Sequence, residues 1–320
     1  MNPLIAVRVA RKRIEAADIA SLILESADGA PLPPAGPGAH IDVHTPSGCV
    51  RQYSLCNLAD EHGHYRIAVL RDSASRGGSI SMHDDVLEGG KLSISAPKNH
   101  FPLREDARHS ILIAGGIGIT PVIAMASALH ARGASFALHY RTRSAARTAF
   151  LRELTHGALA PHCALYHDDA PALRKLELMP LLEAAPPDTH VYVCGPKGFM
   201  DAVISTARAQ HWSEDRIHFE YFAGVATPGA NANSFEVVLA KSGQVVQVAP
   251  SQTIVEVCSA HGVAIPTSCL HGICGTCITR VLEGEVEHKD FYLTPQERAS
   301  HTQMLPCCSR AKSHRLVLDL

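Results

Sequence analysis

The chain has 320 residues, of which 46% are apolar and 19% charged, a composition typical of a soluble globular protein with two or three domains. Its 29 basic and 31 acidic side chains give a net charge of −2 and form no basic stripe, which argues against a nucleic-acid partner. The sequence has no run of 18 apolar residues and no signal peptide at its start, so we expect no membrane span and a cytoplasmic protein. In that compartment the ten cysteines stay reduced unless they bind something.

The first hundred residues predict an antiparallel β-barrel or sandwich. β-branched residues alternate or cluster between Gly, Pro and Asp turn signals in six segments: 4–16, 19–27, 40–46, 50–57, 65–72 and 91–97. Several short strands at close spacing are typical of these architectures.

After residue 104 strands alternate with helices, which predicts a parallel sheet. A buried strand at 110–114 leads into a glycine turn and a helix, with Pro121 expected as its first residue. Further strand-like segments follow at 135–143, 163–169 and 189–196, and helix-like segments at 145–158 and 197–211.

A stretch rich in Gly, Ala, Asn and Pro after residue 222 is typical of a linker. Beyond it, residues 235–250 predict a hairpin across Ser242 and Gly243, and 253–262 predict a short helix that ends at Gly262. We therefore expect three units in series, at residues 1–104, 105–225 and 234–320, with a linker at 226–233.

Three cysteines near the C-terminus have the spacing of a plant-type [2Fe–2S] site. Cys269, Cys274 and Cys277 form C-x4-C-x2-C, and a fourth cysteine follows after 29 intervening residues. Gly272 and Gly275 let the backbone bend so that amides approach the cluster sulfides. Disulfides do not suit a cytoplasmic chain, and structural zinc usually needs two C-x2-C pairs, so an iron–sulfur cluster is the favoured interpretation.

The fourth ligand is ambiguous from spacing alone because Cys307 and Cys308 are adjacent. Neighbours on an extended chain point to opposite faces, so only one of the two can bind the cluster. We interpret four of the other cysteines as packed or loop residues: Cys49, Cys56, Cys163 and Cys258.

Two strand ends resemble nucleotide-binding turns. Gly115, Gly116 and Gly118 lie between a strand and a helix, an arrangement that presents free amides to a phosphate, although the motif is not G-x-G-x-x-G. A second buried strand stops at Cys194-Gly195-Pro196. Ligands of open α/β sheets lie beyond such strand ends.

The barrel segment "RQYS" carries groups that suit a flavin. Arg51 can bind a phosphate, Tyr53 can stack on a flat ring and Ser54 can hydrogen-bond a ring nitrogen. Gly77 and Gly78 precede Ser79, the expected N-cap of a short helix, and could hold the same phosphate. An ordinary strand and an ordinary capped turn are the alternative.

In chain order, R-x-Y-S, G-G-x-G-x-x-P, C-G-P and the cysteine pattern resemble the phthalate dioxygenase reductase family over the full length. The matching segments are "RQYSLCN" at Arg51–Asn57, "RGGSIS" at Arg76–Ser81, "GGIGITP", "CGPKGFM", "HFEYF", "GICGTC" and "CCSRAKSHRLVLDL". The resemblance implies a multidomain fold: an antiparallel FMN-binding β-barrel, an NADH-binding α/β domain with a parallel sheet, and an α+β ferredoxin-like (β-grasp) [2Fe–2S] domain.

The resemblance also implies site residues. The reacting centre would comprise Ser54, Thr120, Cys194 and Phe222. Other contacts to the flavin would come from Arg51, Gln52, Tyr53, Ala68, Val69, Leu70, Gly77, Gly78, Ser79 and Ser81. Contacts to NADH would come from Gly115, Gly116, Gly118, Gly195, Pro196 and Asp168. The cluster ligands would be Cys269, Cys274, Cys277 and Cys307, with Cys308 in the family's small apolar position.

Asp168 favours NADH because a carboxylate repels the 2′-phosphate of NADPH, whereas Arg141 and Arg143 argue for NADPH. The resemblance implies hydride transfer from NADH to FMN and single electrons from FMN through the cluster to a terminal Rieske oxygenase, with no general acid or base. We expect a monomer that docks transiently, with Leu270 to Ile273 at the interface and His271 and His288 on the surface.

Two alternatives remain open. One is an FAD-dependent reductase serving a monooxygenase or a free ferredoxin, which the "RGGSIS" segment disfavours because it suits a terminal FMN phosphate. The other is a non-catalytic iron–sulfur carrier or a zinc-stabilised interaction module.

Overall fold

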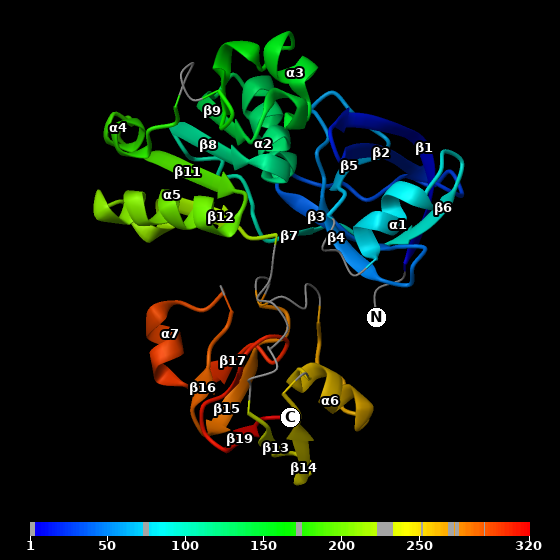
Figure 1. The fold of residues 1–320 in the computed structure, drawn as a ribbon, viewed down its shortest axis with the longest axis vertical. Coiled ribbons are helices and arrows are strands. Elements are labelled where there is room, and N and C mark those ends of the chain that lie inside the picture. The colour runs from blue at the N-terminus through cyan, green and yellow to red at the C-terminus, as the bar shows by residue number, and fades with distance from the viewer. Residues whose placement is uncertain are drawn as a thin grey trace. The chain divides into compact units, whose positions relative to one another are not determined.

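The computed structural model describes residues 4–72, 77–170, 175–222, 233–250, 252–267, 272, 275–290 and 292–320. The chain forms two compact units, Met1–Phe222 and Ala223–Leu320 (Figure 1). The first unit holds an antiparallel barrel together with a parallel sheet, and the second holds a mixed sheet. Within the described ranges, no helix has the length and apolar character needed to cross a bilayer.

The N-terminal strands form the expected antiparallel sheet, in the order β4-β3-β6-β1-β2-β5 with β7 paired to β3. A bridge between Leu55 and Ile67 joins the chain after β4 to β5 and closes the sheet into a barrel. Alternate residues such as Val7 and Val9 fill its interior. The strands are β1 Ile5–Ala16, β2 Ile19–Ser26, β3 Ala39–His44, β4 Val50–Ser54, β5 Tyr65–Leu70, β6 Lys91–Ile94 and β7 Lys98–Asn99.

Helix α1, Gly78–Asp84, begins differently from the expectation. Its N-cap is Gly77, with φ of 96°, and no side chain caps the first turn. Ser79 lies inside the helix, where its Oγ accepts a hydrogen bond from the backbone N–H of Asp72 at 3.2 Å. The prediction of Ser79 as the N-cap was therefore wrong, because glycine adopts the left-handed backbone that this turn requires.

Five parallel strands follow in the order β10-β9-β8-β11-β12, which confirms the alternating pattern read from the sequence. The chain leaves β8 in one direction and returns to its other side at β11, so the switch point lies between these two strands. Helix α2 packs on β8, β9 and β11, and α5 packs on β11 and β12. The strands are β8 His109–Gly115, β9 Ser135–Thr142, β10 Cys163–His167, β11 Thr189–Cys194 and β12 Ile217–Glu220.

The helices of this region are α2 Ile119–Ala131, α3 Leu151–Thr155, α4 Leu178–Glu183 and α5 Lys197–Ala209. Helix α2 starts at Ile119, two residues before Pro121, because a 3₁₀ turn at Gly116–Gly118 leads directly into it. The helix expected over 145–158 is reduced to a 3₁₀ turn and the short α3.

A buried arginine joins the barrel to the parallel-sheet region. Arg66 of β5 contacts Glu15 at 3.2 Å and Glu61 at 3.3 Å within the barrel, and Glu153 of α3 at 3.2 Å. Its guanidinium also lies over the Phe150 ring, 4.8 Å from the centroid. The Arg66 side chain is only 6% exposed, so these partners replace its hydration.

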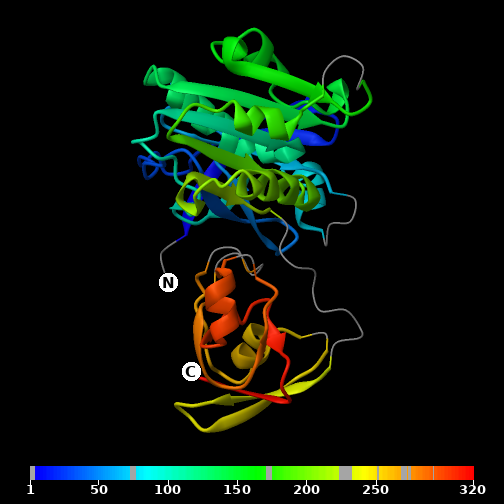
Figure 2. The same cartoon turned by 90° about the vertical axis from the view of Figure 1, so that its left-hand side faces the viewer.

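The second unit has sheet order β14-β13-β19-β15-β17, with the first strand β13 parallel to the last strand β19. The hairpin expected across Ser242 and Gly243 joins β13 to β14 and is drawn in yellow in Figure 2. Thr253 and Glu256 form a capping box that starts α6. The elements are β13 Phe235–Leu239, β14 Gln244–Val248, α6 Ile254–Ala260, β15 Thr279–Glu283, β16 Val286–Glu287, α7 Pro295–Ser300, β17 Gln303–Met304, β18 Arg310–Ala311 and β19 Arg315–Leu318.

Candidate functional site

One corner of the barrel brings together residues that the sequence singled out for a phosphate. A Cβ placed on Gly78 would lie 2.8 Å from Arg51 Nε, so the Arg51 side chain crosses directly over this glycine. Ser81 Oγ in the next turn accepts a hydrogen bond from the backbone N–H of Ser47 at 3.1 Å. Arg51, Gly78 and Ser81 thus share a cationic, hydroxyl-bearing corner that suits a phosphate monoester. Arg76 lies outside the described residues.

The neighbouring part of β4 carries a buried polar atom, the hydroxyl oxygen of Tyr53. Tyr53 Oη is buried without a hydrogen-bond partner among the described residues, and burial raises the pKa of Tyr53. A buried hydroxyl of this kind normally has a partner, so it fits a bound polar ligand. The β5 residues proposed as flavin contacts lie on a strand in contact with β4: Ala68 and Val69 are buried and Leu70 is half-buried.

A glutamate that the sequence analysis missed lies beside Ser54. Ser54 Oγ donates to Glu220 Oε2 at 3.5 Å, and His40 Nδ1 of β3 is 4.0 Å from Glu220 Oε1. Burial raises the pKa of Glu220 to about 8, while the Ser54 hydrogen bond acts in the opposite direction. An acid with this pKa exchanges its proton near neutral pH, which is a property of functional carboxyl groups. Glu220 could have been found from its position at the end of β12, where it pairs with Cys194 in the parallel register.

The two glycine turns pack against each other at the switch point between β8 and β11. A Cβ on Gly118 would lie 2.2 Å from the carbonyl oxygen of Cys194, and one on Gly195 would lie 3.0 Å from Gly115 Cα. Cys194 is fully buried, and burial raises the pKa of its thiol well above the ordinary value. Glycine is required here because the backbones approach too closely for a side chain.

Gly118→Ala is expected to destabilise the first unit by about 1–3 kcal/mol, because the added methyl collides with the Cys194 carbonyl. Gly198→Ala is the matched control: a Cβ at this helical position meets no atom within 4 Å, so stability should be unchanged or slightly higher. Urea unfolding followed by circular dichroism measures both. Equal midpoints for the two variants would contradict the close contact.

The remaining predicted residues follow the carboxyl ends of β8, β10 and β12. Thr120 is buried, and its Oγ1 donates to the carbonyl of Ile117 at 3.0 Å within the glycine turn. Phe222 packs against the core that contains Cys194. Asp168 follows β10 and accepts a hydrogen bond from Arg141 Nε at 2.7 Å. Arg141, which was considered above as a ligand for the 2′-phosphate of NADPH, is therefore paired with a carboxylate.

The cluster region is partly described. Cys269 and Cys274, together with Leu270, His271 and Ile273, lie outside the described residues. Cys277, Cys307 and Cys308 are all buried in the core of the second unit. Cys307 and Cys308 occupy a turn between β17 and β18, so the argument from an extended chain does not hold there. Cys307 as the fourth ligand stays a prediction.

Both glycines of the cysteine loop need their small size. Gly272 has φ of +75°, and a Cβ there would lie 2.4 Å from Cys308 Sγ. Gly275 has φ of +70°, and a Cβ there would lie 2.3 Å from the ring of Tyr292. Left-handed backbone and close neighbours both exclude larger residues at these two positions.

His288 was expected at the surface, and this was wrong. Its side chain is 7% exposed, and its Nδ1 lies 3.3 Å from Asp290 Oδ1. Asp290 is fully buried and accepts hydrogen bonds from the Leu293 backbone N–H and from Ser309 Oγ. These two hydrogen bonds offset the cost of burying the Asp290 carboxylate.

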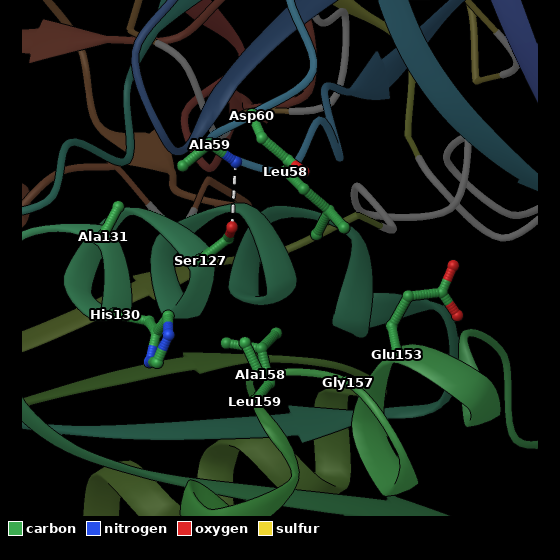
Figure 3. A pocket seen from close by; sticks show the side chains of 10 residues that line it. All are labelled: Leu58, Ala59, Asp60, Ser127, His130, Ala131, Glu153, Gly157, Ala158 and Leu159. Carbon is green, nitrogen blue, oxygen red and sulfur yellow. Dashed lines mark hydrogen bonds between the residues drawn. The ribbon is translucent and has the colours of Figure 1, made fainter.

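A separate cavity of about 410 Å³ lies between the barrel loop at 58–60, α2 and the 157–159 loop (Figure 3). Ala59 donates its backbone N–H to Ser127 Oγ at 2.9 Å beside it. Glu153, which also binds Arg66, contributes to its wall. None of the residues predicted from the sequence lines this cavity, so it is distinct from the candidate site.

Two family models match parts of the chain. Residues 237–312 match the 2Fe-2S iron-sulfur cluster binding domain. Residues 95–217 match the N-terminal domain of the dimethylamine monooxygenase subunit DmmA-like family. The first match covers the second unit, where Cys277 and Cys307 are buried.

Full-length relatives are also similar to this chain. A vanillate O-demethylase oxidoreductase of Pseudomonas sp. strain HR199 is 49% identical over 317 residues, covering 99% of this chain and all of the relative. A phthalate dioxygenase reductase of Burkholderia cepacia is 42% identical and covers 98% of this chain and 97% of its own. A solved phthalate dioxygenase reductase, described as modular for electron transfer from pyridine nucleotides to [2Fe–2S], aligns with a TM-score of 0.80 at 42% identity over 99% of this chain and 98% of its own.

Proposed function

The chain belongs to the phthalate dioxygenase reductase family, and we propose that it transfers electrons from NADH, through FMN and a [2Fe–2S] cluster, to a terminal oxygenase. One observation carries this proposal: the Ser54–Glu220 hydrogen bond joins barrel strand β4 to the carboxyl end of β12. A flavin held on β4 would therefore lie beside the crevice in which parallel sheets bind nucleotides.

FMN would be held by the residues of the barrel corner. Arg51, with the hydroxyls of Ser79 and Ser81 and the backbone at Gly77 and Gly78, would bind its phosphate. Gln52, Tyr53, Ser54, Ala68, Val69 and Leu70 would contact the remainder of the cofactor. The buried Oη of Tyr53 and the Arg51–Gly78 contact support this fit.

NADH would bind at the switch point. The turn at Gly115, Gly116 and Gly118 and the Cys194-Gly195-Pro196 turn would hold its nicotinamide and phosphates, with Thr120 and Phe222 beside the reacting ring. Asp168 would bind the adenosine ribose. The Arg141–Asp168 ion pair supports NADH, because Arg141 already has an anionic partner.

The cluster would be bound by Cys269, Cys274, Cys277 and Cys307. When bound, FMN couples NADH, which donates two electrons at once, to a [2Fe–2S] cluster, which accepts one electron at a time. The chain's contribution is to position these groups and to exclude water from them. Burial of Cys277 and Cys307 in an apolar core supports this assignment.

The partner would be a terminal Rieske oxygenase, a proposal supported by relatives that are named as reductases of dioxygenase and monooxygenase systems. We propose transient docking of a cytoplasmic monomer through Leu270 to Ile273. We also propose domain boundaries at 1–104, 105–225 and 234–320, with a linker at 226–233.

A visible spectrum of the purified protein tests the proposal. We expect flavin bands with a cluster shoulder, release of FMN rather than FAD on denaturation, and faster cytochrome c reduction with NADH than with NADPH. A colourless protein, or zinc at the cysteines, would overturn the proposal. Preference for NADPH would overturn only the role of Asp168.

A further inference from the structure

A chain of polar side chains leads from the barrel surface to Glu220. Lys98 Nζ donates to Asp42 Oδ2 at 2.7 Å, and Gln52 Nε2 donates to Asp42 Oδ1 at 2.9 Å. The same Gln52 nitrogen is 3.4 Å from His40 Nε2. His40 Nδ1 then faces Glu220 Oε1 at 4.0 Å. The exposed fraction of the side chain is 34% at Lys98, 13% at Asp42, 6% at His40 and 13% at Glu220.

The donors and acceptors of this chain fit a consistent arrangement. Lysine only donates, so Asp42 accepts from Lys98 as a carboxylate and must also accept from Gln52. The Gln52 amide is thereby oriented with its nitrogen towards both Asp42 and His40. His40 Nε2 must then accept, which leaves the ring proton of the neutral histidine on Nδ1, directed at Glu220.

We propose that His40 is a positioning residue that holds the Glu220 carboxyl group against Ser54, so that Glu220 takes up and releases a proton there. Gln52, Asp42 and Lys98 would fix the His40 tautomer from the surface. The other polar neighbours of Glu220 among the described residues are Ser54 of β4 and the neutral Cys194 thiol of β11. His100 contacts only the far side of this arrangement, with its ring 5.5 Å from the His40 ring.

The need for such a group rests on the proposed function. Reduction of a bound FMN by NADH would take up a hydride and one further proton, and a cluster would accept two electrons in turn but no protons. Both protons must therefore return to solvent in each cycle. A carboxyl group at Ser54 that exchanges its proton near neutral pH provides one acceptor for this step.

A pH titration of the oxidised, flavin-loaded protein tests the inference without turnover. The visible flavin band is expected to shift as Glu220 ionises, with an apparent pKa of about 8. Glu220→Gln should abolish this titration. His40→Phe should move it upward by about one pH unit, because the ring N–H that points at the carboxylate from 4.0 Å is lost. His40→Gln, which keeps an N–H donor, should restore the wild-type value.

His100→Phe is the control, since His100 is an exposed histidine beside His40 but outside the donor chain. It should leave the titration unchanged. Gln52→Leu provides a second variant if His40→Phe does not fold, and it should shift the titration in the same direction. Superimposable titrations of wild type and both chain variants, or an unchanged titration in Glu220→Gln, would overturn the inference.

Failure of the proposed function is a distinct result. If the purified protein binds no flavin, the proposed function is wrong. The infrared carboxylic acid band of Glu220 in the flavin-free chain then still measures the ionisation of Glu220. A band with the same pH dependence in wild type and His40→Phe would then overturn the role of His40.

Discussion

Cys307→Ser is expected to abolish the iron–sulfur spectrum and cytochrome c reduction, while NADH still reduces the flavin and ferricyanide still oxidises it. A serine hydroxyl is much harder to deprotonate than a cysteine thiol and is a poorer ligand for a cluster iron. The affected site belongs to the second unit, whereas the residues that would bind NADH and FMN belong to the first. Iron content, the visible spectrum and the two acceptor assays measure this directly.

Cys308→Ser is the matched control, since Cys308 is adjacent and equally buried. Among the described residues its Sγ makes long hydrogen bonds, 3.7 Å to the Leu305 carbonyl and 3.8 Å to Ser309 Oγ, so the cost should be about 1 kcal/mol. The variant should keep its cluster. Loss of iron from Cys308→Ser and retention in Cys307→Ser would show that Cys308 is the ligand.

The element pattern of this chain was readable because its signals are local. The strand pattern of 65–72 and the Ser242-Gly243 turn each specify a strand or hairpin from neighbouring residues, and the structure has β5 and the β13–β14 pair there. Errors arose where the chain departs from local rules. Gly77 rather than Ser79 caps α1, because a left-handed residue sets that turn.

The candidate site was less accessible to sequence reasoning because its contacts join distant segments. Ser54 and Glu220 are 166 positions apart, and His40 reaches Glu220 from a third strand. The motifs singled out Ser54 and Cys194, which are the last residues of β4 and β11. They did not reveal that Glu220 becomes buried beside them, since burial follows from the packing of the barrel on the parallel sheet. The burial of His288 was missed for the same reason.

Arg66→Met is expected to destabilise the first unit by about 3–5 kcal/mol, because it leaves Glu15, Glu61 and Glu153 without their shared cation. Methionine keeps much of the side-chain volume, so the lost stability reflects the removed charge rather than a new cavity. Urea unfolding of the first unit, followed by flavin fluorescence, measures it.

Arg71→Met is the control for this result. Arg71 is five positions further along the chain and pairs with Asp84 at 3.0 Å, but its side chain is 38% exposed, so the expected loss is below about 1 kcal/mol. Adding Glu153→Gln to Arg66→Met should recover part of the stability, because one uncompensated carboxylate is removed. Equal losses in the two arginine variants, or no recovery in the double variant, would contradict a buried charge network.

Since Arg66 connects β5 to α3, its loss should also loosen the packing of the barrel on the parallel sheet. NADH-driven flavin reduction in Arg66→Met should then slow more than flavin binding weakens.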